Sequence, residues 1–72
     1  MRTLRFGDRG ADVMQLQLAL SRAGYAVGGI DGIFGPKTLN ALRRFQAANG
    51  LAIDGIAGMN TWTALNKYLY IQ

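Results

Sequence analysis

Apolar side chains recur at helical spacing in three stretches of the chain. The three stripes are Val13, Leu16, Leu20 and Ala23; Leu39, Leu42 and Phe45; and Trp62, Leu65 and Leu69. Residues three and four positions apart lie on the same face of an α-helix, so each stripe gives one helix a buried face. The pattern therefore predicts three helices, at about residues 11–23, 36–49 and 59–68.

Glycine and proline mark where these helices should begin and end. Gly35 is followed by Pro36, and proline is favoured at the first position of a helix, where its missing N–H costs nothing. Gly24-Tyr25 and Gly50-Leu51 end the first two helices, because glycine adopts the left-handed conformation of a helix stop and the next apolar residue packs back on the helix. The breaks between the stripes are thus explained.

An internal repeat relates the two connections. Residues 30–45 align with residues 53–68 with eight identities in sixteen positions, on the skeleton I-D-G-I-x-G-x-x-T-x-x-A-L-x-x-aromatic. A period of 23 residues corresponds to one supersecondary unit. We therefore expect an all-α fold, a compact three-helix bundle in a single domain (residues 1–72), with two Asp-Gly loop–helix repeats related by a pseudo-two-fold axis.

The repeated polar residues have a structural explanation that we favour over a chemical one. Asp31 and Asp54 can accept hydrogen bonds from nearby backbone N–H groups, and the following glycines can take a positive φ. Thr38 and Thr61 lie near helix starts, where a hydroxyl can satisfy an unpaired donor. Neither loop has the alternating ligands and final glutamate of an EF-hand, so no metal and no cofactor is expected.

Composition argues against catalysis by this chain. It has no cysteine and no histidine, and its acidic residues are four aspartates, so the thiol nucleophile and the commonest general base are missing. Asp31 and Asp54 could form the carboxylate pair of a glycoside hydrolase. Acid–base work needs two carboxyl groups with different pKa values, however, and identical loops make them alike. We therefore predict that the chain is not an enzyme.

The net charge of +4 favours an anionic partner, such as nucleic acid, acidic lipid or a carboxylate-bearing wall polymer, although a solvated basic face is equally compatible with it. Links of seven and four residues do not match the short turn of a helix-turn-helix, and no exposed Arg/Asn/Gln cluster is evident. The chain has no apolar run of membrane-spanning length, and its N-terminus has no signal-peptide pattern. We expect no nucleic acid and no membrane as partner.

The chain as a whole resembles the peptidoglycan-binding domain family, the three-helix module of bacterial and phage wall hydrolases. The positions that carry the resemblance are Gly7-Asp8-Arg9-Gly10-Ala11-Asp12-Val13, Leu16-Gln17, Leu20, Gly24-Tyr25, Asp31-Gly32-Ile33-Phe34-Gly35-Pro36-Lys37-Thr38, Ala41-Leu42, Phe45-Gln46, Gly50-Leu51, Asp54-Gly55-Ile56-Ala57-Gly58, Thr61-Trp62 and Leu65. The likeness extends from Gly7 to about Leu69. Met59 departs from it, because many members have proline there, which leaves the start of the last helix less rigid.

The resemblance implies non-catalytic binding of the glycan and stem peptide of peptidoglycan, by a monomer covalently attached to a lytic domain on its C-terminal side. It implies action at the bacterial cell wall or in the periplasm, and the lack of a visible signal peptide fits a phage lysin made in the host cytoplasm. A docking module or inhibitory prodomain is the alternative, weakened because no cysteine is present to cap a zinc ion. A basic nucleic-acid binder is less favoured still.

We predict that the ligand groove lies on the surface of the loops. Its expected members are Asp31, Gly32, Phe34, Asp54 and Trp62, with Arg43 and Arg44 contacting carboxylates. Phe34 is chosen because its counterpart in the repeat is Ala57, so the turn itself does not require the ring. Trp62 is chosen because an indole N–H needs a partner and often marks a rim. On this interpretation, Phe34→Ala weakens binding and leaves the helices intact.

Overall fold

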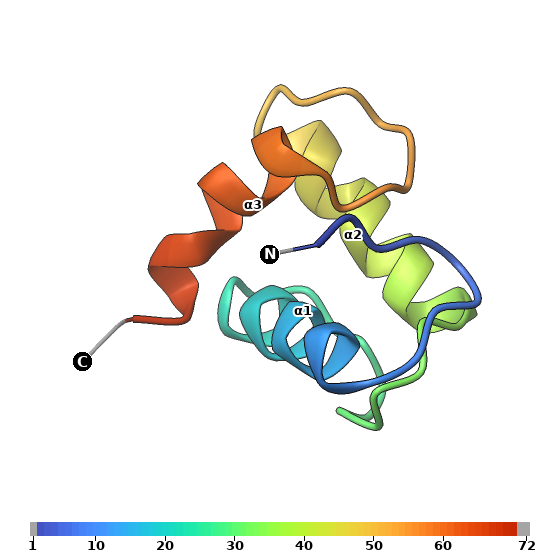
Figure 1. Ribbon diagram of the computed structural model, residues 1–72. Helices are drawn as coiled ribbons and strands as arrows, with labels where there is room; N and C mark the ends of the chain where they lie inside the picture. Colours follow the sequence, from blue (N-terminus) through green and yellow to red (C-terminus); the bar gives the residue numbers. More distant parts are fainter. Residues whose placement is uncertain (1, 71–72) are drawn as a thin grey trace.

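The computed structural model describes residues 2–70 and consists of three helices joined by two long loops (Figure 1). The helices are α1 (Ala11–Arg22), α2 (Pro36–Ala48) and α3 (Met59–Leu65), and α3 continues into a 3₁₀ turn, η1 (Asn66–Tyr68). Within residues 2–70 there is no β-strand, only two isolated β-bridges. The predicted all-α, three-helix class is confirmed, and the helices begin at the expected residues.

All three helices begin after a glycine. The N-terminal caps are Gly10, Gly35 and Gly58, and none of the three helices has a side-chain cap. The carbonyl oxygen of each glycine accepts the amide N–H four positions later, at 3.2, 3.0 and 2.9 Å. The shared start of α2 and α3 follows from the repeat, in which a glycine precedes the first helical residue; Gly10 gives α1 the same start outside the repeat.

The first two helices end in the same way, as the sequence predicts. At the end of α1, φ of Gly24 is 99°, and the Tyr25 N–H donates to the Leu20 carbonyl at 2.9 Å. At the end of α2, φ of Gly50 is 68°, and the Leu51 N–H makes the equivalent bond, also 2.9 Å. Only glycine takes such positive φ values without strain, and the bonds satisfy carbonyls that would otherwise lack donors. These stops turn the chain into each loop.

The core lies between the helices and reaches under both loops. Its buried apolar members are Leu4, Val13, Leu16, Ala19, Leu20, Val27, Phe34, Ala41, Leu42, Phe45, Ala57, Trp62 and Leu65. Phe45 of α2 packs edge-on against Tyr25 and Tyr68, with ring centroids 5.8 and 6.4 Å away. Such aromatic pairs favour a perpendicular arrangement because the ring edge is positive and its face negative. The three rings thus connect the segment after α1, helix α2 and the turn η1.

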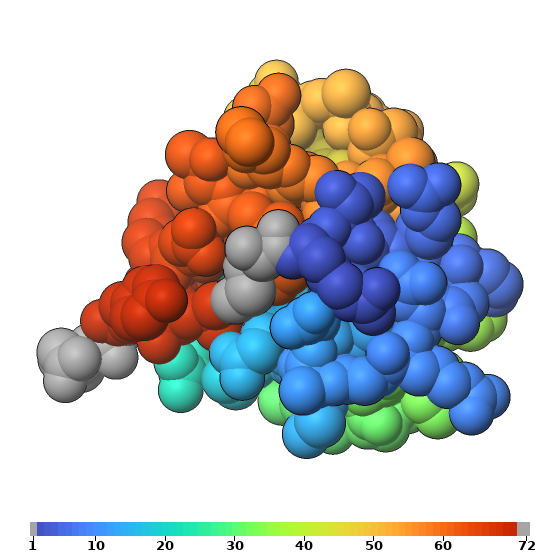
Figure 2. Space-filling model, in the orientation of Figure 1, coloured from blue at the N-terminus to red at the C-terminus, as the bar shows by residue number. Residues whose placement is uncertain are grey.

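The N-terminal segment, Leu4–Gly10, ties the two loops together. Leu4 and Ala57 exchange backbone hydrogen bonds of 3.2 and 2.8 Å, so this segment pairs with the second loop. A few residues on, the Gly7 N–H donates to the Phe34 carbonyl at 3.0 Å, which pairs the segment with the first loop. Figure 2 shows the segment (blue) lying across the surface between α1 and the second loop (orange). Each loop is therefore held by backbone pairing on one side.

Candidate functional site

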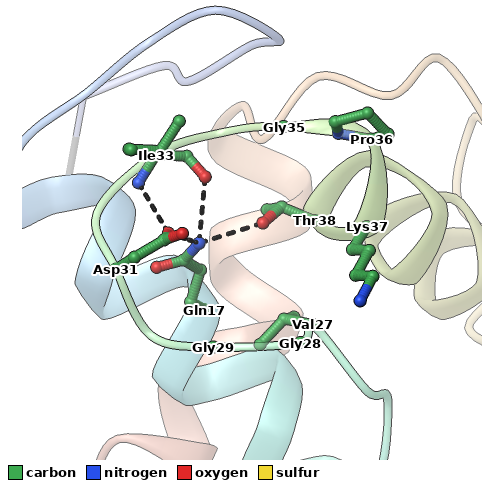
Figure 3. Close-up of a pocket in the computed structure, with 10 residues that line it drawn as sticks. All are labelled: Gln17, Val27, Gly28, Gly29, Asp31, Ile33, Gly35, Pro36, Lys37 and Thr38. Carbon is green, nitrogen blue, oxygen red and sulfur yellow. Dashed lines mark hydrogen bonds between the residues drawn. The ribbon is translucent and has the colours of Figure 1, made fainter.

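A buried glutamine organises the first loop. The Nε2 atom of Gln17, a side chain of α1 that is 1% exposed, lies 3.0 Å from three oxygens: Asp31 Oδ1, the Ile33 carbonyl and Thr38 Oγ1 (Figure 3). Its Oε1 accepts the Gly32 N–H at 2.9 Å. One amide thus links α1, the loop and the first turn of α2. Buried polar groups of this kind are stabilising only when fully paired, as here.

The second loop repeats this arrangement atom for atom. Nε2 of Gln46 lies 3.0 Å from Asp54 Oδ1 and the Ile56 carbonyl and 3.2 Å from Thr61 Oγ1, and its Oε1 accepts the Gly55 N–H at 3.1 Å. Gln46 is fully buried. The repeat in the sequence is therefore a repeat of hydrogen bonds. The two-fold axis that we expect to relate them stays a prediction.

Hydrogen bonds keep both loop carboxylates ionised. The side-chain amide of Gln17 and the Ile33 N–H, 3.0 Å from Oδ1, lower the pKa of Asp31. The Ile56 N–H, at 2.9 Å, is the main cause that lowers the pKa of Asp54. Donors to a carboxylate favour its charged form. A general acid needs the opposite, a raised pKa. The pair is suited to accepting hydrogen bonds, not to donating protons.

A groove of about 590 Å³ opens beside the first loop (Figure 3). We call it the first-loop groove; it is lined by Gln17, Val27, Gly28, Gly29, Asp31, Ile33, Gly35, Pro36, Lys37 and Thr38. Gly28 makes room for Lys37: its φ is +85°, and a Cβ there would lie only 2.8 Å from Lys37 Cδ. The glycine thus lets the lysine stem lie against the loop. Figure 3 shows Lys37 extending from α2 toward the loop segment of Val27 and Gly28.

The first-loop groove presents a cation and an anion. The ion pair found within residues 2–70 joins Arg2 and Asp12, at 2.9 Å, so the Lys37 ammonium has no ion-pair partner in that range. The exposed Asp31 carboxylate, whose Oδ1 is held by the Gln17 network, lines the same groove. An ammonium can donate three hydrogen bonds, and a carboxylate only accepts them. The groove can therefore bind a carboxylate and N–H groups of one ligand.

A smaller cavity of about 190 Å³ lies beside the second loop. We call it the second-loop pocket; its lining residues are Leu51, Ala52, Asp54, Ile56, Gly58, Met59, Asn60 and Thr61. The last six stand 23 positions after lining residues of the first-loop groove. The duplication has therefore produced two cavities from equivalent residues. Asn60 occupies the position of Lys37, and Met59 that of Pro36.

The predicted site residues do not form one surface. Asp31 lines the first-loop groove and Asp54 the second-loop pocket. Arg43 and Arg44 are exposed on α2 and line neither cavity. The Arg43 side chain runs beside the second loop, with Nε 3.3 Å from where a Cβ on Gly55 would lie. Lys37 of the same helix, which the sequence analysis did not select, provides the cation at a cavity.

Three residues that the sequence predicted to bind the ligand are buried and cannot contact it. Phe34 is 1% exposed, because its ring fills the core where the second repeat has the smaller Ala57. Trp62 is 4% exposed, and its indole N–H already donates to the Arg2 carbonyl at 3.2 Å. Gly32 is buried and gives its N–H to the Gln17 network. We therefore remove all three from the candidate binding surface.

The two buried glutamines were not predicted, because their spacing in the sequence marks them only weakly. Gln17 and Gln46 each follow an apolar stripe residue, in the pairs Leu16-Gln17 and Phe45-Gln46. The distance from glutamine to aspartate is 14 residues in the first unit and 8 in the second. A search at one constant period therefore does not align the glutamines. Allowing a gap between helix and loop would have found them.

Residues 2–70 contain neither a metal-binding cluster nor a membrane-spanning helix. Across residues 2–70, no three acidic, histidine or cysteine side chains gather where a metal ion could bind. None of the described helices combines the length and apolarity needed to cross a membrane.

The comparison with protein families agrees with this geometry: the chain belongs to the peptidoglycan binding domain family, whose model matches residues 9–65. This is a non-catalytic binding domain. Among solved structures, an endolysin of the Burkholderia AP3 phage is 53% identical with a TM-score of 0.86, over 89% of this chain and 24% of that one. The SleB N-terminal domain is 42% identical with a TM-score of 0.88, over 92% and 90%.

Two curated relatives are enzymes by name. The zinc D-Ala-D-Ala carboxypeptidase of Streptomyces albus G is 49% identical over 74 aligned positions, which cover 97% of this chain and 27% of the relative. The spore cortex-lytic enzyme of Bacillus cereus is 46% identical over 61 residues, 85% of this chain and 24% of the relative. The chain thus spans about a quarter of the length of these relatives.

Proposed function

We propose that the chain binds peptidoglycan at the first-loop groove, with the Lys37 ammonium on a stem-peptide carboxylate and Asp31 accepting a peptide N–H. The observation that carries this proposal is the pair of opposite charges in one groove, with Lys37 free of an ion-pair partner among residues 2–70. A charge-assisted hydrogen bond is about twice as strong as a neutral one, so the lysine would provide most of the polar attraction.

The dimensions of the groove support a peptide ligand. Its volume of about 590 Å³ lies within the range of about 300–1,000 Å³ typical of ligand sites. Its wall combines Val27, Ile33 and Pro36 with the two charged groups, which suits a short peptide that has both apolar and polar parts. The half-exposed Ile33 side chain, 44% accessible, would lose apolar surface to water on binding.

The biological role we propose is to hold an attached lytic domain at the bacterial cell wall. Two relatives of about four times this length are named as a spore cortex-lytic enzyme and a zinc D-Ala-D-Ala carboxypeptidase, and this chain matches only a part of each. Binding by the module would raise the local concentration of the attached domain at its substrate. The module itself would act as a monomer with no cofactor.

Retention on purified peptidoglycan sacculi tests this function. We expect the chain to sediment with the insoluble sacculi and to stay bound in the presence of excess duplex DNA. Few charges are involved, so raising salt from 50 to 200 mM should weaken binding only a few-fold, whereas a nucleic-acid binder with several phosphate contacts loses about 10³-fold or more. Release by DNA would favour the nucleic-acid alternative, and no retention under any condition would favour a docking or prodomain role.

A further inference from the structure

The second-loop pocket is a copy of the first-loop groove in which one charge has been lost. The equivalent residues of the two cavities are Asp31 and Asp54, Ile33 and Ile56, Gly35 and Gly58, Pro36 and Met59, Lys37 and Asn60, and Thr38 and Thr61. The backbone and glutamine network behind them is the same in both loops. The second pocket therefore occupies the position in its repeat that the first-loop groove occupies in the other.

From this relation we infer that the second-loop pocket is a second ligand subsite, which takes an uncharged amide of the same wall polymer. The inference rests on the function proposed above. Asp54 offers the pocket a carboxylate acceptor, and Asn60 replaces the ammonium with a carboxamide. A ligand carboxylate would find repulsion from Asp54 and no cation that lines the pocket. An amide donates to Asp54 and accepts from Asn60, so both of its hydrogen-bonding sides are matched.

Size points to the same class of ligand. The second-loop pocket has about 190 Å³ against about 590 Å³ for the first-loop groove. The first link between helix and loop is longer and includes Gly28 and Gly29, which line its groove; the shorter second link has only Leu51 and Ala52 at that place. The smaller volume suits a single amide-bearing group, such as an N-acetyl group or a carboxamide, rather than a length of peptide.

The two cavities lie beside the loops that precede and follow α2. Pro36 and Lys37 of the first-loop groove begin this helix, and Leu51 of the second-loop pocket follows its end. A 13-residue helix is about 20 Å long at 1.5 Å per residue. Peptidoglycan repeats its chemical groups along each strand, so one polymer could occupy both subsites. Occupancy of the second would then be intramolecular and would raise the overall affinity without a stronger single contact.

Chemical-shift mapping of the ¹⁵N-labelled chain tests the second subsite. Three soluble probes separate the sources of the ligand: a stem peptide with free carboxyl groups, the same peptide with its carboxyl groups amidated, and an N-acetylglucosamine oligomer without peptide. We expect the free peptide to shift the amides of Gly32 and Ile33. At least one amide-bearing probe should shift those of Gly55 and Asn60, and which probe does so identifies carboxamide or N-acetyl as the ligand.

Variants sharpen the test. Asn60→Ala should weaken binding of the active amide probe about fivefold or more, whereas Asn40→Ala, an exposed asparagine of α2 outside both cavities, should change it less than twofold. Asn60→Lys should shift the preference of the second-loop pocket toward the free peptide. Suppose that no amide-bearing probe shifts the amide signals of residues 54–61 while the free peptide saturates the first-loop groove. The inference of a second subsite is then wrong, and the proposed function stands. If no probe moves either loop, both are wrong.

Discussion

Replacing Phe34 by alanine should lower the free energy of unfolding by about 3–5 kcal/mol, the usual cost of removing a buried phenylalanine ring. Phe34 is 1% exposed and lies under the first loop, where its backbone also pairs with the N-terminal segment. A chain of 72 residues has a total stability of roughly 4–11 kcal/mol, so this loss removes much of it. Thermal unfolding followed by circular dichroism should show a midpoint lower by about 15–30 °C.

Phe6→Ala is the matched control, because Phe6 is 58% exposed and its ring contributes little buried area. Its unfolding free energy should change by less than about 0.5 kcal/mol. A large loss of stability in Phe34→Ala would reverse the prediction from sequence, in which this substitution leaves the helices intact and weakens binding. A Phe34→Ala protein with a midpoint within a few degrees of the parent would contradict the burial of the ring.

The second large effect should come from the buried glutamines. Gln17→Ala should cost about 2–4 kcal/mol, because it leaves the buried Gly32 N–H and the Thr38 hydroxyl without their partner. Gln46→Ala removes the same bonds from the second loop, so its cost should agree within about 1 kcal/mol. Chemical denaturation measures both.

Gln15→Ala, an exposed change on the same helix, should be nearly neutral and controls for helix propensity. The Gln17 variant has a second measurable effect. The Gln17 amide is the main cause of the lowered pKa of Asp31, so this pKa should rise in Gln17→Ala when followed by NMR titration. A costly Gln17→Ala beside a harmless Gln46→Ala would show that the two networks are not equivalent in energy.

The fold could be predicted because its signals are local. Pro36 starts a helix because its φ is already fixed near the helical value, and Gly24 stops one through a φ of 99° that few other residues adopt. Both are properties of a few neighbouring residues. In both Asp-Gly turns a nearby backbone N–H donates to the aspartate, as the sequence predicts: that of Ile33 to Asp31 Oδ1 and that of Ile56 to Asp54 Oδ1. Each of these inferences depended on residues within a few positions of one another.

The site could not be predicted as well, because it depends on contacts between distant residues. Phe34 and Ala57 stand at equivalent positions and are both buried in the core, and nothing near Phe34 in the sequence reveals that its larger ring is buried as well. Trp62 has its indole partner 60 positions away, at Arg2. Lys37 lies at a groove because Gly28 leaves room for its stem, a relation that appears only once the loop is folded. Charge and exposure alone favoured the arginines of α2.

The most direct test of the account is the affinity of the chain for a soluble stem peptide with free carboxyl groups, measured by titration calorimetry on Lys37→Ala beside Lys67→Ala. Lys37 lines the first-loop groove, and Lys67 is an exposed lysine outside it. A hydrogen bond to a charged group contributes about 1.5–3 kcal/mol, so Lys37→Ala should weaken binding about tenfold or more, and Lys67→Ala less than twofold. Equal affinities in the parent and Lys37→Ala, or equal losses in both variants, would contradict binding at this groove.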